Sequence, residues 1–476
     1  MELKEYKFRQ LLDVTRGASL SGEYYATEGK YIRLTLGHFD YQNGGFKENT
    51  SKDNLYFTGD VKDEFILNEG DIITPLTEQT FGLIGSTAII PESGKYIQSQ
   101  DIGLVKCNEE LLYPGFCYYL LPTALVKNQL SAGAQQTSIR HTSPDKIKDC
   151  TVFIPSLPEQ KRIAQLLSSI DKKIMLNRAI NQNLEALAKQ LYDYWFVQFD
   201  FPNEEGKPYK SSGGKMKYSD ELQIEIPDDW NICRLNEYVS KNNTGDWGAD
   251  NPSENSIEIG CIRGADIIKL NNLPKRYIKS SNRAKLLSEW DVVIEVSGGS
   301  PVQATGRSAF ITPGVIERNG GKITCSNFCH AFSFKDYRES AYFFYIWKMF
   351  YDNDIMFNYE GKTSGIKNFM TETFLANRWA KAPKELIYKF FDTIRGVYAK
   401  IDANITENND LIKQRDELLP LLMNGQVSLN SDLAVIALLI YSHLLRYPME
   451  VHPEGYVYHP SKYGEQGYRC DDVKHT

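Results

Sequence analysis

The sequence has no long apolar run, few cysteines and no excess of positive charge, and each absence excludes a class of protein. No uninterrupted apolar stretch reaches the roughly 18–20 residues that cross a membrane, and the start MELKEYKFRQ lacks the apolar core of a signal peptide. Eight unclustered cysteines in 476 residues indicate reduced thiols in a cytoplasm rather than a disulfide scaffold. The net charge of −7 excludes a protein that coats DNA indiscriminately, but it allows a local basic patch.

The chain repeats itself at a spacing of about 220–230 residues. Short β-branched and aromatic runs alternate with Gly, Asn and Asp within each copy, which predicts a mixed α/β unit. The period is too long for a solenoid, so we expect a duplicated domain. Five phrases recur in the same order: Tyr31-Ile-Arg33 and Cys261-Ile-Arg263, Gly70-Asp71 and Trp290-Asp291, Gly85-Ser-Thr-Ala88 and Gly306-Arg-Ser-Ala309, Phe116-Cys-Tyr-Tyr119 and Tyr342-Phe-Phe-Tyr345, Thr137-Ser-Ile-Arg140 and Thr363-Ser-Gly-Ile-Lys367.

A long amphipathic helix is predicted after each copy, over 158–196 and 385–423. Ser156 and Glu159 form a capping-box pattern at the start of the first helix. We expect Pro420 to kink or end the last regular turn of the second helix and Asn424-Gly425 to supply its C-terminal stop. Apolar residues follow the 3.5-residue period of a coiled-coil seam. The seam residues are Ile163, Leu167, Ile170, Ile174, Leu184, Ala188, Leu191 and Trp195, and an offset of 227 gives Phe390, Ile394, Val397, Ile401, Leu411, Arg415, Leu418 and Leu422.

Two seam positions in the middle of each helix are asparagine, namely Asn177, Asn181, Asn404 and Asn408. If the helices pair antiparallel and in full overlap, Asn177 and Asn181 meet Asn408 and Asn404. Buried seam asparagines fix the register of a coiled coil, because a slip leaves amides unpaired against leucine. The alternative is that the asparagines merely loosen two helices that pack separately.

The predicted fold class is therefore α+β, with two duplicated mixed α/β heads separated by two long antiparallel coiled-coil helices in a pseudo-twofold arrangement. We expect heads at 1–155 and 201–383, helical regions at 156–200 and 384–428, and an extension of unknown role at 429–476. Two similar heads at the ends of a rod suit a ligand with two separated sites, and duplex DNA is the obvious candidate.

The strongest DNA-facing candidate is residues 274–285, which carry five basic residues and no acidic one. Mobile cations on a loop suit phosphate contacts, whereas Arg, Asn or Gln suit base edges; a solvated basic face is the alternative. Gln135 and Gln136 could read adenine edges or lie on a surface loop. Arg140 and Lys367 occupy matching positions in the two copies. A basic residue at both positions favours a phosphate or structural contact over base reading, because base-reading residues should differ between heads with different targets. The candidate set is Arg33, Gln135, Gln136, Arg140, Arg263, Lys275, Arg276, Lys279, Arg283, Lys285, Arg307 and Lys367.

Catalytic and metal-binding motifs are not found. Gly361-Lys-Thr-Ser364 resembles the end of a phosphate-binding loop, but Met356 replaces the leading glycine. Cys325, Cys329 and His330 have no second cluster to complete a metal site, so we expect ordinary strand cysteines. The sequence therefore predicts a chain without a catalytic site, metal or cofactor of its own.

Two phrases resemble the conserved helical regions of the specificity subunits of type I restriction–modification systems. They are Ile154-Pro-Ser-Leu-Pro-Glu-Gln-Lys161, which leads into Ile170-Asp171, and Leu418-Leu-Pro-Leu-Leu-Met-Asn-Gly425. The resemblance covers residues 1 to about 428. It implies that each head reads one half of a split DNA sequence and that the helices set the gap between the halves.

The same resemblance implies partners and a location. It implies docking of two adenine methyltransferase subunits, and a restriction–translocase subunit that can join them, in the cytoplasm of a bacterium or archaeon. S-adenosylmethionine, ATP and magnesium are then expected on those partners, and this chain is expected to be non-catalytic. The alternative function is a coiled-coil scaffold without DNA sequence readout.

Overall fold

The computed structural model describes residues 2–40, 44–78, 82–132, 140–300, 302–363 and 366–427, and the predicted extension at 429–476 lies outside them. Its contacts divide the chain into unit 1, which contains 2–173 and 411–427, and unit 2, which contains 174–410. Each unit thus holds one head and one section of each long helix. The expected domain boundaries at 155, 200 and 383 stay a prediction.

Head 1, residues 4–154 of unit 1, is built on a four-stranded antiparallel sheet. Its strand order is β2 (Leu12–Arg16), β10 (Ile102–Cys107), β6 (Ile72–Pro75), β8 (Ala88–Ile89). An outer sheet has the order β3 (Tyr25–Ala26), β5 (Tyr56–Phe57), β4 (Tyr31–Arg33), β9 (Tyr96–Ile97). Two further pairs are β1 (Lys4–Lys7) with β12 (Thr151–Ile154) and β7 (Thr77–Glu78) with β11 (Arg140–His141), and the helices are α1 (Phe8–Leu11), α2 (Pro114–Leu120), α3 (Ala124–Ala132) and α4 (Pro144–Lys148).

Head 2, residues 231–381 of unit 2, repeats this plan. Its central sheet has the order β16 (Val239–Thr244), β23 (Cys329–Phe334), β19 (Val292–Glu295), β21 (Ser308–Phe310), and its outer sheet has the order β18 (Lys275–Lys279), β17 (Ser256–Ile262), β22 (Ile323–Cys325). A third sheet contains β20 (Ser297–Gly298), β25 (Ile366–Phe369) and β24 (Glu360–Thr363). β15 (Asn231–Arg234) pairs with β26 (Arg378–Lys381), and the helices are α6 (Pro313–Arg318), α7 (Ser340–Asp352) and α8 (Thr371–Leu375). Before head 2, β13 (Met216–Ser219) pairs with β14 (Ile224–Pro227).

The two heads match at their unusual contacts as well as in strand order. β4 pairs parallel with β9, and β17 pairs parallel with β22, although most other pairs in the heads are antiparallel. After the first strand of each central sheet the chain crosses so closely that a Cβ atom on Gly17 or Gly245 would lie 2.4 or 2.1 Å from a backbone carbonyl oxygen. The predicted duplication of a mixed α/β fold is confirmed.

The long helices are α5 (Leu157–Tyr192) and α9 (Lys384–Met423), with α5 followed by a π-helical turn at Asp193–Val197. Pro420 lies inside α9 and does not end it. The helix continues to Met423 and stops before Gly425, at φ 69°, which confirms the predicted stop at Asn424-Gly425. The predicted capping role of Glu159 is also wrong, because its Oε1 accepts from Arg162 instead.

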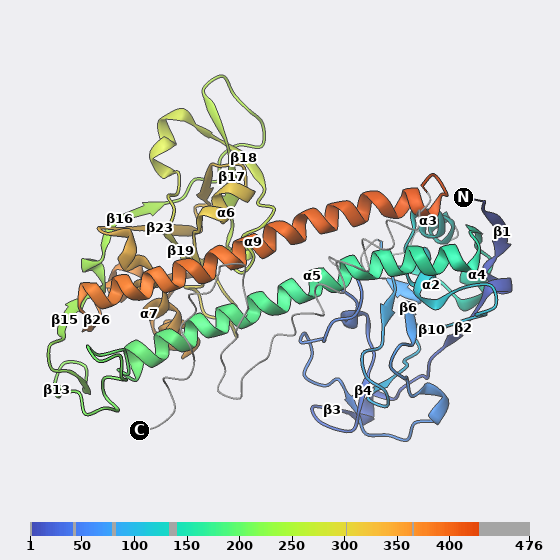
Figure 1. Cartoon of the computed structure of the whole chain (residues 1–476), viewed down its shortest axis with the longest axis horizontal. Helices are drawn as coiled ribbons and strands as arrows, with labels where there is room; N and C mark the ends of the chain where they lie inside the picture. The colour runs from blue at the N-terminus through green and yellow to red at the C-terminus, as the bar shows by residue number, and fades with distance from the viewer. Residues whose placement is uncertain are drawn as a thin grey trace, which may run out of the picture. The chain divides into compact units, whose positions relative to one another are not determined.

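The helices pair antiparallel within each unit (Figure 1). In unit 1, Leu167 of α5 shares a buried cluster with Leu422 of α9. In unit 2, Ala188 of α5 shares one with Phe390 and Ile394 of α9. As residue numbers rise along α5 they fall along α9, which is the predicted antiparallel direction. None of the helices among the described residues has the length and apolarity needed to cross a membrane.

Candidate DNA interface

The four seam asparagines form two buried pairs between α5 and α9 in unit 2. Asn177 Nδ2 donates to Asn408 Oδ1 at 3.0 Å, and Asn404 Nδ2 donates to Asn181 Oδ1 at 2.7 Å. Asn177 also donates to Glu407, at 2.7 Å. Asn177 and Asn404 are each 1% exposed, so an amide shifted from its partner would lose its hydrogen bond away from water. The structure thus places the asparagines opposite one another as the spacing predicts.

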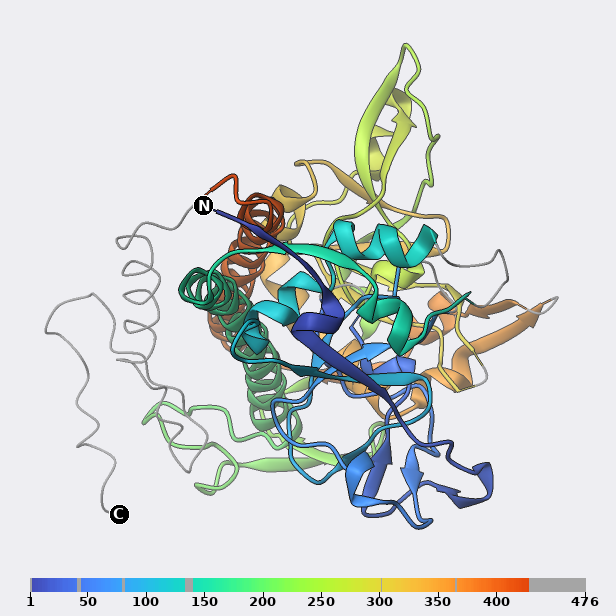
Figure 2. The ribbon, with the colours of Figure 1, turned by 90° about the vertical axis from the view of Figure 1, so that its right-hand side faces the viewer.

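The basic segment 274–285 is not a loop. It forms β18 and then a 3₁₀ helix at Ser280–Lys285, and Figure 2 shows β17 and β18 projecting from the rest of unit 2 as a hairpin. Lys279 and Arg283 are exposed, and neither side chain has a hydrogen bond or ion pair with any described residue. These two side chains are free to contact a phosphate.

Three other cations of this segment have partners. Lys275 is exposed but lies 3.0 Å from Glu258 Oε1, and Lys285 donates to the Gly245 carbonyl at 2.8 Å. Arg276 is 7% exposed; it pairs with Asp250 and donates to the Trp247 carbonyl at 3.1 Å. Its guanidinium thus holds the β18 strand to the preceding loop, and DNA contact by Arg276 stays a prediction.

Arg307 and Lys367 are also structural. Arg307 makes a bidentate ion pair with the buried Glu295, at 2.9 and 2.7 Å, and donates to the Gly264 carbonyl at 2.8 Å. Lys367 lies 2.8 Å from Glu360 Oε2 and donates to the Ser300 carbonyl at 2.7 Å. Each cation joins segments of head 2 that are distant in sequence, and DNA contact by either residue stays a prediction.

Arg33 and Arg263 are not equivalent, although the sequence phrases align them. Arg263 begins a 3₁₀ turn, is exposed, and makes a bidentate pair with Asp266 at 2.7 and 2.9 Å. The matching turn of head 1 begins at Thr35. Arg33 lies two residues earlier in β4 and is 7% exposed. The outer strands are therefore shifted by two residues relative to the sequence alignment.

For three candidates of head 1, no side-chain contact is described. Gln135 and Gln136 lie outside the described residues. Arg140 belongs to β11, where its backbone pairs with Glu78 of β7. Lys367 of β25 pairs in the same way with Gly298 of β20, so the repeated phrase marks a repeated strand pair.

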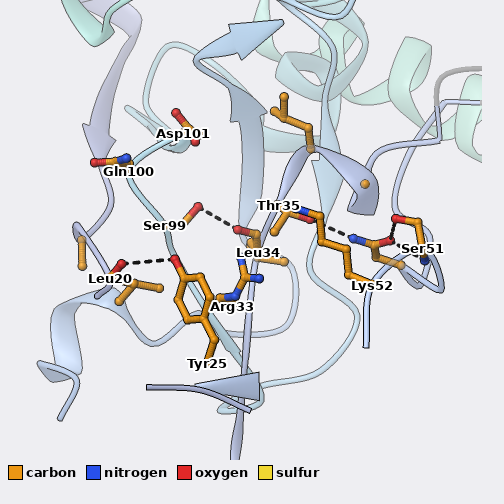
Figure 3. Close-up of a pocket in the computed structure, with 14 residues that line it drawn as sticks. Leu20, Tyr25, Arg33, Leu34, Thr35, Ser51, Lys52, Ser99, Gln100 and Asp101 are labelled. Carbon is orange, nitrogen blue, oxygen red and sulfur yellow. Dashed lines mark hydrogen bonds between the residues drawn. The ribbon is translucent and has the colours of Figure 1, made fainter. Parts of the chain in front are cut away.

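Arg33 lines a cavity of about 360 Å³ in head 1 (Figure 3). Its guanidinium stacks on the Tyr25 ring at 3.7 Å from the centroid, and its Nη2 donates to the Asn54 carbonyl at 3.1 Å. The Nε atom is buried and has no hydrogen-bond partner. Lys52 and Asp101 also line the cavity, and neither was a sequence candidate because no repeat or basic run marks them.

A half-buried polar network, also missed by sequence reasoning, joins head 1 to its helices. Asp171 of α5 accepts from Tyr119 at 2.6 Å and pairs with Arg415 of α9 at 2.9 Å. Burial and the Asp171 charge raise the pKa of Tyr119, which keeps its hydroxyl as the donor. Arg415 stands at a seam position, and that polar interruption was the available signal.

The metal-site and nucleotide-loop patterns are ordinary structure. Among the described residues no group of His, Cys, Asp and Glu could hold a metal ion. Cys325 and Cys329 are buried strand residues, and burial raises the pKa of the Cys329 thiol to about 12. Gly361 lies in the β24–β25 hairpin rather than in a loop before a helix.

Similarity to known proteins agrees with this architecture. Residues 2–186 match the family described as type I restriction modification DNA specificity domain. The MjaIX type I specificity subunit of Methanocaldococcus jannaschii is 26% identical over 329 residues, 66% of this chain and 68% of that protein. The EcoBI specificity subunit of Escherichia coli is 23% identical over 260 residues, 53% of this chain and 52% of that protein. Residues 2–186 thus match the DNA specificity domain of type I restriction–modification systems, and the two relatives named are specificity subunits of such systems.

Structural similarity supports the same fold. The crystal structure of a type I system S subunit from M. genitalium has a TM-score of 0.51 and 16% identity, covering 89% of this chain and 96% of that one. The match over residues 2–186 and the relatives named above indicate DNA recognition rather than a scaffold without sequence readout.

Proposed function

We propose that this specificity subunit reads a DNA sequence in two parts, one with each head, and directs methyltransferase subunits to adenines within it. The observation that carries the proposal is the repetition of one head topology in two units whose solvent-facing residues differ. Shared strands supply a common scaffold, while the 3₁₀ turn after β18 carries Arg283 and Lys285 and the matching turn after β5 carries Asp63 and Glu64. Two heads of one fold with different surfaces suit two different half-sites.

The helices would set the spacing between those half-sites and dock two methyltransferase subunits, in the cytoplasm of a bacterium or archaeon. S-adenosylmethionine would then bind the methyltransferases, and ATP and magnesium would bind a restriction–translocase subunit where one joins. The Asn177–Asn408 and Asn181–Asn404 pairs support the spacing role, since they oppose any slip of α5 along α9.

Adenine-methylation mapping tests the proposal directly. Plasmid DNA is mapped from cells that express the chain with its neighbouring methyltransferase, and from cells that express the methyltransferase alone. A two-part methylated sequence that requires the chain is the expected result. Association of the two proteins without any new methylated sequence would contradict sequence readout.

The phosphate role of the head 2 hairpin has its own test. Each cation that neutralises a phosphate adds about one unit to the slope of log affinity against log salt concentration. The variant Lys279→Gln/Arg283→Gln should therefore lower that slope by about two units. Lys335→Gln, an exposed lysine of the same head, is the matched control and should leave the slope unchanged.

A further inference from the structure

Each head buries an arginine against an aromatic ring at its outer sheet, and the two arginines differ in one respect. Arg33 lies 3.7 Å from the Tyr25 ring centroid, and Arg276 lies 4.4 Å from the Trp247 ring centroid. Both arginines are 7% exposed. Arg276 has a carboxylate partner in Asp250, whereas no carboxylate of a described residue forms an ion pair with Arg33.

The missing counter-charge at Arg33 is costly. A guanidinium removed from water is stabilised by an opposite charge and by full use of its N–H donors. Arg33 Nη2 contacts only neutral oxygens, the Asn54 carbonyl at 3.1 Å and the Asn54 Oδ1 at 3.4 Å, and the buried Nε has no partner. The Arg33 charge also acts on His38. Burial, the largest cause, and the Arg33 charge lower the pKa of His38 to about 4, although a hydrogen bond with the Thr35 backbone acts in the opposite direction.

The cavity beside Arg33 has a fixed wall. Asn49 donates to Thr35 Oγ1 at 2.9 Å, Ser51 Oγ donates to Asn49 Oδ1 at 2.6 Å, and Ser99 Oγ donates to the Leu34 carbonyl at 2.7 Å. These polar groups are therefore already used within the protein (Figure 3). The side chains of Lys52, Gln100 and Asp101 also line the cavity, and they have no hydrogen bond or ion pair with a described residue.

We propose that this cavity of head 1 binds a phosphate group, with Arg33 and Lys52 as its cationic donors. The inference rests on the proposed function for its preferred source, a backbone phosphate of the DNA half-site read by head 1. Free inorganic phosphate is the other source of the same chemistry. Asp101 opposes an anion, so it weakens binding and keeps the phosphate exchangeable.

The DNA source is tested with the full chain in complex with its methyltransferase, on a duplex that carries the mapped sequence. Lys52 is exposed, so Lys52→Gln leaves the fold intact and should lower the salt slope by about one unit. Lys62→Gln, an exposed lysine of head 1 outside the cavity, is the control. A scan of single neutral methylphosphonate linkages should find one linkage that weakens wild-type binding at least threefold and does not weaken Lys52→Gln further.

Binding of free inorganic phosphate is tested by thermal unfolding of the full chain in inorganic phosphate and in sodium chloride at equal ionic strength. A saturable stabilisation by phosphate is expected in wild type and in Lys62→Gln, and it should be lost in Lys52→Gln and in Arg33→Gln. Asp101→Asn removes a charge that repels an anion. It should therefore strengthen phosphate binding in the DNA-binding assay or in the thermal-unfolding assay, according to which one detects the site.

The outcomes separate the two proposals. A methylphosphonate position coupled to Lys52 identifies DNA as the source, and saturable stabilisation without such a position identifies free phosphate. If Lys52→Gln and Lys62→Gln behave alike in both assays, the phosphate site is overturned. If the wild-type complex shows no preference for any sequence, the proposed function fails, while the thermal assay still decides the cavity.

Discussion

The buried asparagine pairs make a quantitative prediction about helix register. Asn177 is 1% exposed and Asn408 is 7% exposed, and the amide of the first donates to the carbonyl of the second at 3.0 Å. Replacing one asparagine by leucine leaves the other amide buried without its partner, which costs about 1–3 kcal/mol. Leucine recovers part of that cost by apolar burial, so each single variant should lower the free energy of unfolding of unit 2 by about 1–2 kcal/mol.

The double variant Asn177→Leu/Asn408→Leu should behave differently. Replacing both polar partners by apolar side chains of similar volume is neutral or stabilising, so its stability should equal or exceed that of wild type. The coupling energy between the two positions is then about 1–3 kcal/mol. Because the chain has two units, a single unfolding transition is not assumed. Hydrogen exchange of the amides at 174–192 and 384–410 measures unit 2 by itself. Additive single and double effects would refute the reasoning.

Register is checked in separate cysteine variants by disulfide formation. Cysteines at 177 and 408 should join rapidly, whereas cysteines at 177 and 404 lie one helical turn apart, about 6 Å further along the axis, and should join slowly. The described native cysteines are buried except for the half-buried Cys107, so they compete little. In the Asn177→Leu/Asn408→Leu chain, the same cross-linking test at 181 and 404 should become less selective, because part of the register constraint is gone.

Three further predictions concern the heads. Gly17→Ala and Gly245→Ala should each destabilise their own head by about 1–3 kcal/mol or more, since the added Cβ meets a backbone carbonyl; local hydrogen exchange checks this. Arg307→Met leaves Glu295 buried and unpaired, so head 2 should lose about 3–5 kcal/mol, and Arg307→Met/Glu295→Gln should recover part of it in denaturant unfolding. His38 has a pKa of about 4 when folded and about 6.5 when unfolded, so its contribution of about 3 kcal/mol to head 1 is present above pH 6.5 and lost as the pH falls to 4. Thermal unfolding of His38→Asn should show a weaker loss over that range.

The helices could be predicted from sequence because their signal is local and periodic. The positions of the seam residues along α5 and α9 follow from a 3.5-residue repeat, and the asparagine positions follow from the interruption of that repeat. The end of α9 could also be predicted, because Asn424-Gly425 is a typical C-terminal stop and the helix ends at Met423. Pro420 removes only one backbone donor close to the C-terminus, and the helix continues for three more residues.

The DNA-facing residues could not be predicted in the same way, because their burial depends on distant partners. Arg276 is paired by Asp250 and Arg307 by Glu295, and neither pairing is visible in a run of positive charge. One signal was available in the sequence Lys275-Arg-Tyr-Ile-Lys279. Alternate side chains of a strand point to opposite faces, so reading this segment as a strand would have placed Arg276 on the buried face with Ile278, as the structure does.

Duplication preserved the scaffold but not the contact between head and helix. In unit 1 Tyr119 donates to Asp171, which Arg415 neutralises. In unit 2 the offset of 227 places Tyr398 at the position of Asp171 and Ala188 at that of Arg415, and Tyr398 contacts Tyr345 at 3.4 Å instead. If two copies of the first half paired through α5, each Asp171 would face alanine and lose its cation. The ion pair therefore favours association of α5 with α9 over association of α5 with itself. The two halves have become specific for each other while each kept the same fold.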